Sequence, residues 1–574
     1  MNRNTESHFA VNPTRIDISR STFDRSHSVK LTFDTGDLVP FFVDEVLPGD
    51  TFSIDTSRVV RMQSLLTPMM DNLYLDTYFF FVPNRLVWEH WKQFNGENTQ
   101  SAWLPTTEYS IPQLTAPAGG WEIGSLADYF GIPTGVSGLS VNALPFRAYA
   151  LICNEWFRDE NLTDPINFPT GDATVVGTNG TNYIQDVPKG GKPFKAAKYH
   201  DYFTSCLPAP QKGPDVTIPV ISGVEIPVYP MPKSVPSPSP AGVVYPYGGP
   251  PLFLGGHVAY KPESGDSLPG YYYERVANGV KSTSFVKSIS SLDSDYAVGQ
   301  DDAAVPLNLW AVGDGNASAA TINQLRMAFQ IQKLYERDAR GGTRYIEILK
   351  SHFGVTSPDS RLQRPEYLGG NRVPININQI VQQSATGEEG SSTPQGTPVG
   401  LSLTTDTHSD FTHSFVEHGF VIGLMVARYD HTYQQGIERF WSRKDRFDYY
   451  WPVFANIGEQ AVLNKEIYAQ GTAEDDEVFG YQEAWADYRY KPNRVCGEMR
   501  SSAPQSLDVW HLADDYDKLP SLSDSWIRED GKTVDRVIAV SSRVSQQLFA
   551  DIYVQNRTTR PMPLYSIPGL IDHH

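Results

Sequence analysis

Hydrophobic and polar residues alternate along several stretches near both ends of the chain. Residues 29–33, 52–55 and 548–555 all show this two-residue period. Because successive side chains of a β-strand point to opposite faces, the period predicts strands with one buried face. Residues 73–82 and 417–429 are instead hydrophobic on both faces, which is typical of strands in the middle of a buried sheet.

Three stretches between these predicted strands have a helical period instead. They cover residues 85–94, 142–158 and 321–341. In the last of them, hydrophobic residues recur every three or four positions until a Gly-Gly pair ends the pattern. Strands and helices do not alternate as they do in parallel β-α-β folds. We therefore expect a mainly β fold, an antiparallel barrel or sandwich with a few helices in its long connections.

Two stretches rich in Pro and Gly interrupt these patterns, at 110–138 and 207–270. Long irregular segments in a compact protein are usually functional or disordered. The second stretch is too aromatic for simple disorder, because it contains Tyr229, Tyr245 and Tyr247 among other rings. We interpret it as an ordered surface excursion that contacts a partner. The alternative is a flexible linker between two domains.

Composition narrows the class of protein. The chain has 574 residues, is 40% hydrophobic and 12% aromatic, and has a formal net charge of −19. It is too hydrophobic to be disordered. The net negative charge argues against a surface that is basic all over, but it does not exclude a local basic patch that binds nucleic acid.

The spacing of the cysteines and the length of the apolar runs indicate in which cellular compartment the protein is expected. The three cysteines are far apart and form no Cys-x-x-Cys pair. This argues against a disulfide framework or a thiolate zinc site and suits a reducing cytoplasm. Neither a signal peptide nor an apolar run of 18 residues is visible, so we expect no membrane insertion.

No catalytic or nucleotide-binding motif is present. His408, His413 and His418 could suit zinc, but a spacing of five does not place all three on one face of a strand or helix. The acidic runs 474–477 and 514–517 lack the EF-hand spacing, so we expect solvated loops. Paired carboxylates for glycoside hydrolysis stay open, because such pairs are distant in sequence. We predict no enzyme and no catalytic or cofactor-binding residues.

Both ends of the chain combine arginine with aromatic rings. The DNA-facing candidates are Arg15, Arg20 and Arg25 at the start and Arg557 and Arg560 at the end. Single-stranded nucleic acid is held by backbone charges and by stacking on rings, so these ends supply both kinds of contact. The alternative is an ordinary scatter of arginines.

Long segments of the sequence resemble the major capsid proteins of the Microviridae, the small single-stranded DNA bacteriophages, and most closely the gokushovirus branch. The resemblance is carried by residues 23–54, 65–97, 144–162, 344–355 and 364–370, which include LLTPMMDNLYLDTYFFFVPNRLVWEHWKQFNGE and LPFRAYALICNEWFRDENL. It covers nearly the whole chain and is weakest over about 165–320.

The resemblance implies an eight-stranded antiparallel viral jelly roll with long inserted loops. It implies one such domain over 1–574, with a variable surface insertion at about 207–305 as the candidate three-fold protrusion. Sixty copies would form a T = 1 icosahedral shell around circular single-stranded DNA, with contacts at the five-fold, three-fold and two-fold axes. The insertion would contribute to host attachment, with Tyr229, Tyr245 and Tyr247 as host-contact candidates.

The resemblance also implies partners. An anionic shell cannot neutralise its genome, so a small basic internal DNA-binding protein is expected. An internal scaffolding protein during assembly and a host surface receptor are expected as well. A structural divalent cation fits the family, but its ligands are unknown. The protein would be a virion component made in the bacterial cytoplasm.

A function from a different class stays open. The aromatic content and acidic charge also suit a carbohydrate-binding or carbohydrate-cleaving β-sandwich, such as a phage receptor-binding protein or a glycosidase.

Overall fold

The computed structural model describes residues 19–98, 107–216, 322–383 and 395–565, with the backbone of short elements between 228 and 311. The chain contains two compact units, 1–213 with 335–574 and, separately, 214–334. The second unit overlaps the predicted insertion at 207–305. The boundaries of that insertion and the single jelly-roll domain over 1–574 stay predictions.

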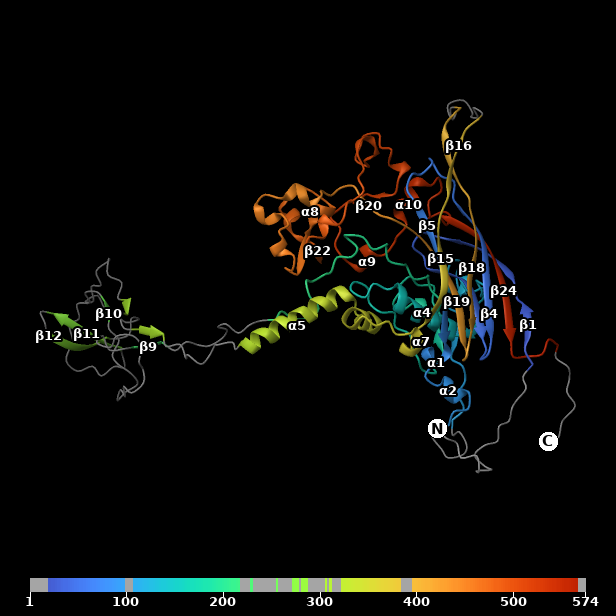
Figure 1. Ribbon diagram of the computed structural model, residues 1–574, viewed down its shortest axis with the longest axis horizontal. Helices are drawn as coiled ribbons and strands as arrows, with labels where there is room; N and C mark the ends of the chain where they lie inside the picture. The colour runs from blue at the N-terminus through green and yellow to red at the C-terminus, as the bar shows by residue number, and fades with distance from the viewer. Residues whose placement is uncertain are drawn as a thin grey trace. The chain divides into compact units, whose positions relative to one another are not determined.

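One sheet of the larger unit brings the two ends of the chain together. Its strands lie in the order β1-β24-β4-β18, and β2 also pairs with β24. Their bounds are Ser21–Asp24 (β1), His27–Phe33 (β2), Thr51–Met62 (β4), Thr404–Ser414 (β18) and Leu548–Arg560 (β24). Because β2 and β1 pair with successive parts of β24, they form one interrupted edge strand. Figure 1 labels the other strands of this sheet together with β1.

The other sheet has the order β15-β5-β19-β3. Its strands are Val39–Val46 (β3), Leu73–Pro83 (β5), Glu366–Pro374 (β15) and Gly419–Tyr429 (β19), and all pairs in both sheets are antiparallel. Successive strands switch sheets at every step except from β5 to β15, which is how a jelly roll wraps. The mainly β antiparallel fold is confirmed. The two described sheets hold four strands each when β1 and β2 are counted as one, and the eight-stranded jelly roll stays a prediction.

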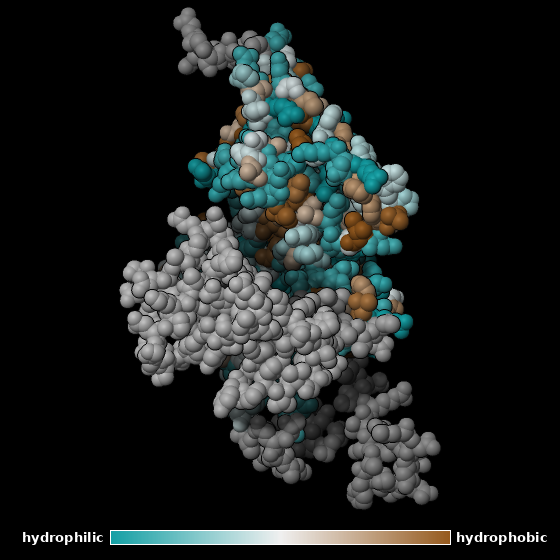
Figure 2. Space-filling view, turned by 90° about the vertical axis from the view of Figure 1, so that its left-hand side faces the viewer, coloured by the Kyte–Doolittle hydropathy of each residue, from teal (hydrophilic) through white to brown (hydrophobic). Residues whose placement is uncertain are grey.

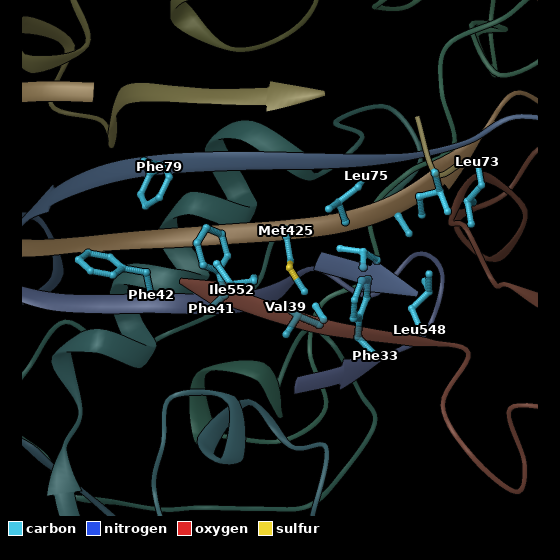
Figure 3. Close-up of a cluster of buried hydrophobic side chains, with 14 of the residues drawn as sticks. Phe33, Val39, Phe41, Phe42, Leu73, Leu75, Phe79, Met425, Leu548 and Ile552 are labelled. Carbon is cyan, nitrogen blue, oxygen red and sulfur yellow. The ribbon is translucent and has the colours of Figure 1, made fainter. Parts of the chain in front are cut away.

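The two sheets enclose the first hydrophobic core (Figure 3). Along β4, alternate residues from Phe52 to Met62 are buried, as the two-residue period predicts. β24 alternates in the same way from Leu548. Phe79 of β5 and Met425 of β19 point into this core from the opposite sheet. Each of these strands therefore contributes one face to the space between the sheets.

β5 and β19 are buried on their other face too. Phe80 and Ile422 pack there in a second hydrophobic core with the helix α4 (Leu144–Ile152), which continues as a π-helical turn over Cys153–Phe157. The predictions of two central strands and of a helix at 142–158 are confirmed. The helix predicted at 85–94 is present as two short helices, α1 (Asn84–Val87) and α2 (Trp91–Phe94).

The rest of the chain that packs on this outer face of β5 and β19 contains short stretches of helix and strand. They are β6 (Gln113–Thr115), α3 (Leu126–Tyr129), β7 (Ser140–Asn142) and β8 (Val175–Val176). Trp121, on the stretch expected to be a long loop, is almost fully buried in this second core. The stretch 110–138 is therefore part of the packed structure.

A third hydrophobic core lies outside the two sheets and includes Tyr202, Phe203 and Trp526. The elements after β19 are β20 (Thr432–Tyr433), β21 (Glu459–Leu463), α8 (Asn464–Ile467), β22 (Val478–Glu483), β23 (Ala513–Asp514), α9 (Asp524–Ile527) and α10 (Lys532–Val537). Between β5 and β18, the larger unit also contains α6 (Tyr345–Ile348), α7 (Asp359–Leu362), β16 (Ile377–Val381) and β17 (Pro398–Ser402). No helix within the described ranges is long and apolar enough to cross a bilayer.

The unit at 214–334 contains small antiparallel pairs. They are β9 (Val228–Pro230) with β14 (Leu309–Ala311), β10 (Leu254–Gly255) with β13 (Val305–Pro306), and β11 (Tyr271–Ala277) with β12 (Val280–Val286). The helix α5 (Ile322–Gly341) begins in this unit and confirms the helix predicted at 321–341. Thr321, the residue that would cap it, lies outside the described residues.

A buried arginine joins the two sheets. Arg58 of β4 donates from Nη1 to Oγ1 of Thr77 on β5 at 2.8 Å. Its Nη2 lies 3.3 Å from Oδ1 of Asp410 and 3.6 Å from Oδ2 of Asp406 on β18. The Arg58 and Asp410 side chains are at most 1% exposed. Burial raises the pKa of Asp410, and the positive charge of Arg58 offsets part of that rise.

We expect Arg58→Ala to lower the free energy of unfolding by about 3–5 kcal/mol, because it leaves Asp410 buried without its counter-charge. Chemical denaturation of the full chain measures this. The matched control is Lys30→Ala on β2, whose ion pair with Asp551 is solvent-exposed. It should cost less than about 1 kcal/mol. Equal effects of the two substitutions would contradict a structural role for the buried pair.

A second buried ionic cluster ties the end of β19 to the third core. Nδ1 of His431 lies 3.0 Å from Oδ1 of Asp514, and Nε2 lies 2.8 Å from Oε2 of Glu529. Burial alone lowers the pKa of His431, but the two carboxylates raise it to about 9. The expectation of a solvated loop at 514–517 is therefore wrong for Asp514, which is buried and has a lowered pKa.

This cluster predicts a pH dependence of stability. The folded pKa of His431 is raised above its ordinary value of 6.5, so its contribution is complete below pH 6.5 and is lost as the pH rises through 9. The change is on the order of 3 kcal/mol. Denaturation between pH 6 and pH 10 should show this loss in the parent chain, and His431→Gln should remove most of the slope. An unchanged slope would contradict the assignment.

Candidate nucleic-acid interface

The arginines at the two ends of the chain are neighbours in the fold. β1 and β24 pair antiparallel, with Ser21 opposite Arg560 and Asp24 opposite Arg557. Arg20 directly precedes β1, so it lies at the same end of the sheet as Arg560. The structure therefore brings four of the five DNA-facing candidates to one edge of the first sheet. The fifth, Arg15, lies outside the described residues.

Three of these arginines bond within the protein. Nη2 of Arg20 donates to the carbonyl oxygen of Gly49 at 2.6 Å. Nε of Arg560 lies 3.1 Å from Oδ2 of Asp50, in the same turn. Arg25 forms a two-pronged ion pair with Asp44 of β3 at 2.5 and 2.8 Å.

Arg557 differs from these three. It is exposed and has no ion pair with any described residue. Among the four described candidates, its guanidinium is therefore the most available to a ligand. The DNA-facing role of all five arginines stays a prediction.

The host-contact candidates fall in the second unit. Tyr229 lies in β9, where its backbone pairs with that of Trp310 in β14. Tyr245 and Tyr247 lie outside the described residues. Their role in contacting a host also stays a prediction.

The candidate metal-ligating histidines do not form a cluster that could bind a metal ion. Within the described ranges, no group of three or more His, Cys, Asp or Glu side chains could hold a metal ion. His413 lies 4.0 Å from Glu366, and the ring of His418 packs against Trp91. The acidic run 474–477 is largely exposed, as predicted. The structural divalent cation stays a prediction without assigned ligands.

The third core carries a concave surface that our reading of the sequence did not single out. This basic-aromatic pocket has a volume of about 640 Å³. Its charged lining residues are Arg439, Arg443, Arg489, Lys491, Arg494 and Arg500 against Glu438, Glu466 and Asp487, and its rings include Phe440, Trp441, Tyr488 and Tyr490. Figure 2 shows hydrophobic groups exposed among hydrophilic ones on the side of the molecule that carries α8.

A sequence signal for this pocket exists. Residues 439–451 read RFWSRKDRFDYYW, in which cationic and aromatic residues are interleaved. The other wall, residues 487–500, follows only after β22 and cannot be assigned to the same site without the fold. This internal run has a higher density of arginine and aromatic residues than either end of the chain.

Comparison with known proteins identifies the family. The family model described as "Capsid protein (F protein)" matches residues 12–570. The chain belongs to this family of phage capsid proteins. Its relatives include the proteins named "Capsid protein VP1" of Spiroplasma virus 4 (42% identical, covering 96% of both chains) and Chlamydia phage 1 (43%, 98% of both). Another is that of Bdellovibrio phage phiMH2K (43%, 99% of this chain and 98% of the relative).

The resemblance to Microviridae major capsid proteins of the gokushovirus branch is thereby confirmed. The protein is a structural component of a virion, and capsid proteins assemble with copies of themselves. This role agrees with the two-sheet sandwich and with the long segments that connect its strands.

The terminal arginines separate into two groups that a stability measurement can distinguish. Arg25→Ala removes a two-pronged pair from the largely buried Asp44, and we expect a loss of about 1–2 kcal/mol of unfolding free energy. Arg557→Ala removes an exposed side chain and should change stability by less than about 0.5 kcal/mol. Chemical denaturation measures both, and a larger loss for Arg557→Ala would contradict these assignments.

Proposed function

We propose that sixty copies of this chain form a closed T = 1 icosahedral shell around a circular single-stranded DNA genome. The observation that carries the proposal is the capsid-family match over nearly the whole chain. Closed symmetry requires each copy to bury several different surfaces against its neighbours. The long segments between the sandwich strands supply the extra surface that such contacts need.

The charge of the chain supports the proposed partners. At −19 per copy, the shell and the genome are both anionic. Packaging then requires cations from another source, which the proposal assigns to a small basic internal DNA-binding protein. Assembly in the bacterial cytoplasm also uses an internal scaffolding protein. The proposed role involves no catalysis.

Host attachment is assigned to the surface insertion at about 207–305. Its support is the separate compact unit at 214–334 and the Pro, Gly and Tyr content of this stretch. A unit that folds apart from the sandwich can vary without disturbing the two cores. Tyr229, Tyr245 and Tyr247 are its candidate contacts with a host receptor.

The test is to express the full chain in bacteria together with the proposed scaffolding and basic proteins. We expect closed particles of uniform diameter in negative-stain microscopy, containing nuclease-protected single-stranded DNA. In a second arm, deletion of 225–260 should preserve particles and abolish attachment to the host. A stable monomer that binds or cleaves glycans would overturn the proposal in favour of the carbohydrate-active alternative.

A further inference from the structure

We propose that the basic-aromatic pocket of the third core is a binding site for single-stranded DNA. It would stack bases on its exposed rings and bind the phosphates with the cations of its rim. This inference rests on the proposed function, because it identifies a surface of the shell protein that contacts the genome. The pocket is distinct from the terminal arginines on β1 and β24, which lie on the edge of the first sheet.

The charge of the pocket is opposite to that of the chain. Its lining holds six Arg or Lys side chains against three Asp or Glu side chains, a balance of three positive charges in a protein of −19. A local patch of this kind attracts an anionic ligand despite the overall charge, because screening limits the reach of distant charges.

The cations at the rim are available to a ligand. The side chains of Arg489, Lys491 and Arg494 are 60%, 64% and 66% exposed. Lys491 and Arg494 share a single carboxylate, that of Glu438, while Arg489 pairs with Glu483. The rim therefore has one cation more than its acids neutralise, and all three heads can reach phosphate oxygens.

The rings of the pocket stand beside these cations. Trp441 is 71% exposed, and its ring lies 4.7 Å from that of Phe440, centre to centre. Nζ of Lys491 lies 5.2 Å from the centre of the Phe440 ring. Tryptophan is highly buried on average in folded proteins, so an indole this exposed is unusual. An exposed indole next to exposed cations is an arrangement that can hold a base and its phosphate together.

Two arginines of the pocket are held by contacts within the protein. Arg443 pairs with Asp487, and its guanidinium lies 4.2 Å from the centre of the Tyr488 ring. Its side chain is only 9% exposed, and its Nε has no hydrogen-bond partner among the described residues. Arg500 is held by the carbonyl oxygen of Gln434 at 3.0 Å. Side chains that are already held in place lose less conformational entropy when a flexible strand binds.

Single-stranded DNA fits this pocket better than an acidic peptide does. Both ligands would meet the cations, but only nucleobases have the flat faces that stack on Trp441 and Phe440. Paired bases in a duplex present no free face, so the same argument favours a single strand. The volume of about 640 Å³ is within the range of pockets that hold small ligands, which suits one or two nucleotides of a longer strand.

The experiment measures binding of a fluorescein-labelled 20-nucleotide oligothymidylate to the full chain by fluorescence anisotropy at several salt concentrations. The charge variant is Arg489→Gln with Arg494→Gln, which leaves the Lys491–Glu438 pair in place. Its matched control is Lys92→Gln with Lys532→Gln, which removes two exposed cations that lie outside the pocket and off strands β1, β2 and β24. The stacking variant is Trp441→Ala, at a side chain exposed enough to be dispensable for folding.

We expect the charge variant to bind about tenfold more weakly at 150 mM salt and to reduce the slope of log affinity against log salt by about 1.4, for two lost phosphate contacts. Trp441→Ala should weaken binding by about fivefold or more and leave that slope unchanged, because stacking involves no counterions. The control pair should bind like the parent chain. These three results together support the pocket.

Other outcomes overturn the proposal. Equal loss in the charge variant and its control would show non-specific attraction. Parent-like binding by both pocket variants would place the DNA contact elsewhere. Equally tight binding of a duplex, or of a polyglutamate peptide of matched charge, would assign the pocket to a different ligand. If the pocket variants still form particles with protected DNA while the oligonucleotide result is negative, the pocket assignment fails and the proposed capsid function stands.

Discussion

The sheet containing β5 and β19 is hydrophobic on both faces, and the rest of the larger unit depends on covering it. One face packs against the first sheet, and burial of each large apolar side chain there contributes about 1.5–3 kcal/mol. The other face would be an exposed apolar surface without the helix α4 and the chain around it. The part of the chain around α4 is thus required by the sandwich, although it forms no part of either sheet.

Two buried ionic clusters lie where separate parts of the described fold meet. Arg58 and its two aspartates lie between the sheets, and His431 with its two carboxylates lies where β19 meets the third core. Buried charges are tolerated when each has a partner and hydrogen bonds, and they fix how the parts fit because an unpaired member is costly. The exposed cations of the basic-aromatic pocket differ, because their acids do not fully neutralise them.

The local pattern predicted much of the fold. The period of two located β2, β4 and β24, and the double-sided runs located β5 and β19, because burial of a strand face depends on residues adjacent in sequence. The pattern misled at Asp514, where two adjacent acids indicated a solvated loop although His431 lies 83 positions away. At 110–138 the sequence predicted a long loop, but it did not show that Trp121 packs in the second core.

By itself, the sequence determined the antiparallel β class, the positions of the main strands and helices, and the capsid family, since period and long motifs are local properties. Only the tertiary structure decided which strands share a sheet, that the arginines of both ends meet on one edge, and that residues 439–443 and 487–500 enclose one pocket. These depend on contacts between residues far apart in the chain. The number of residues between two positions does not give their distance in space, because that distance is set by how the core packs.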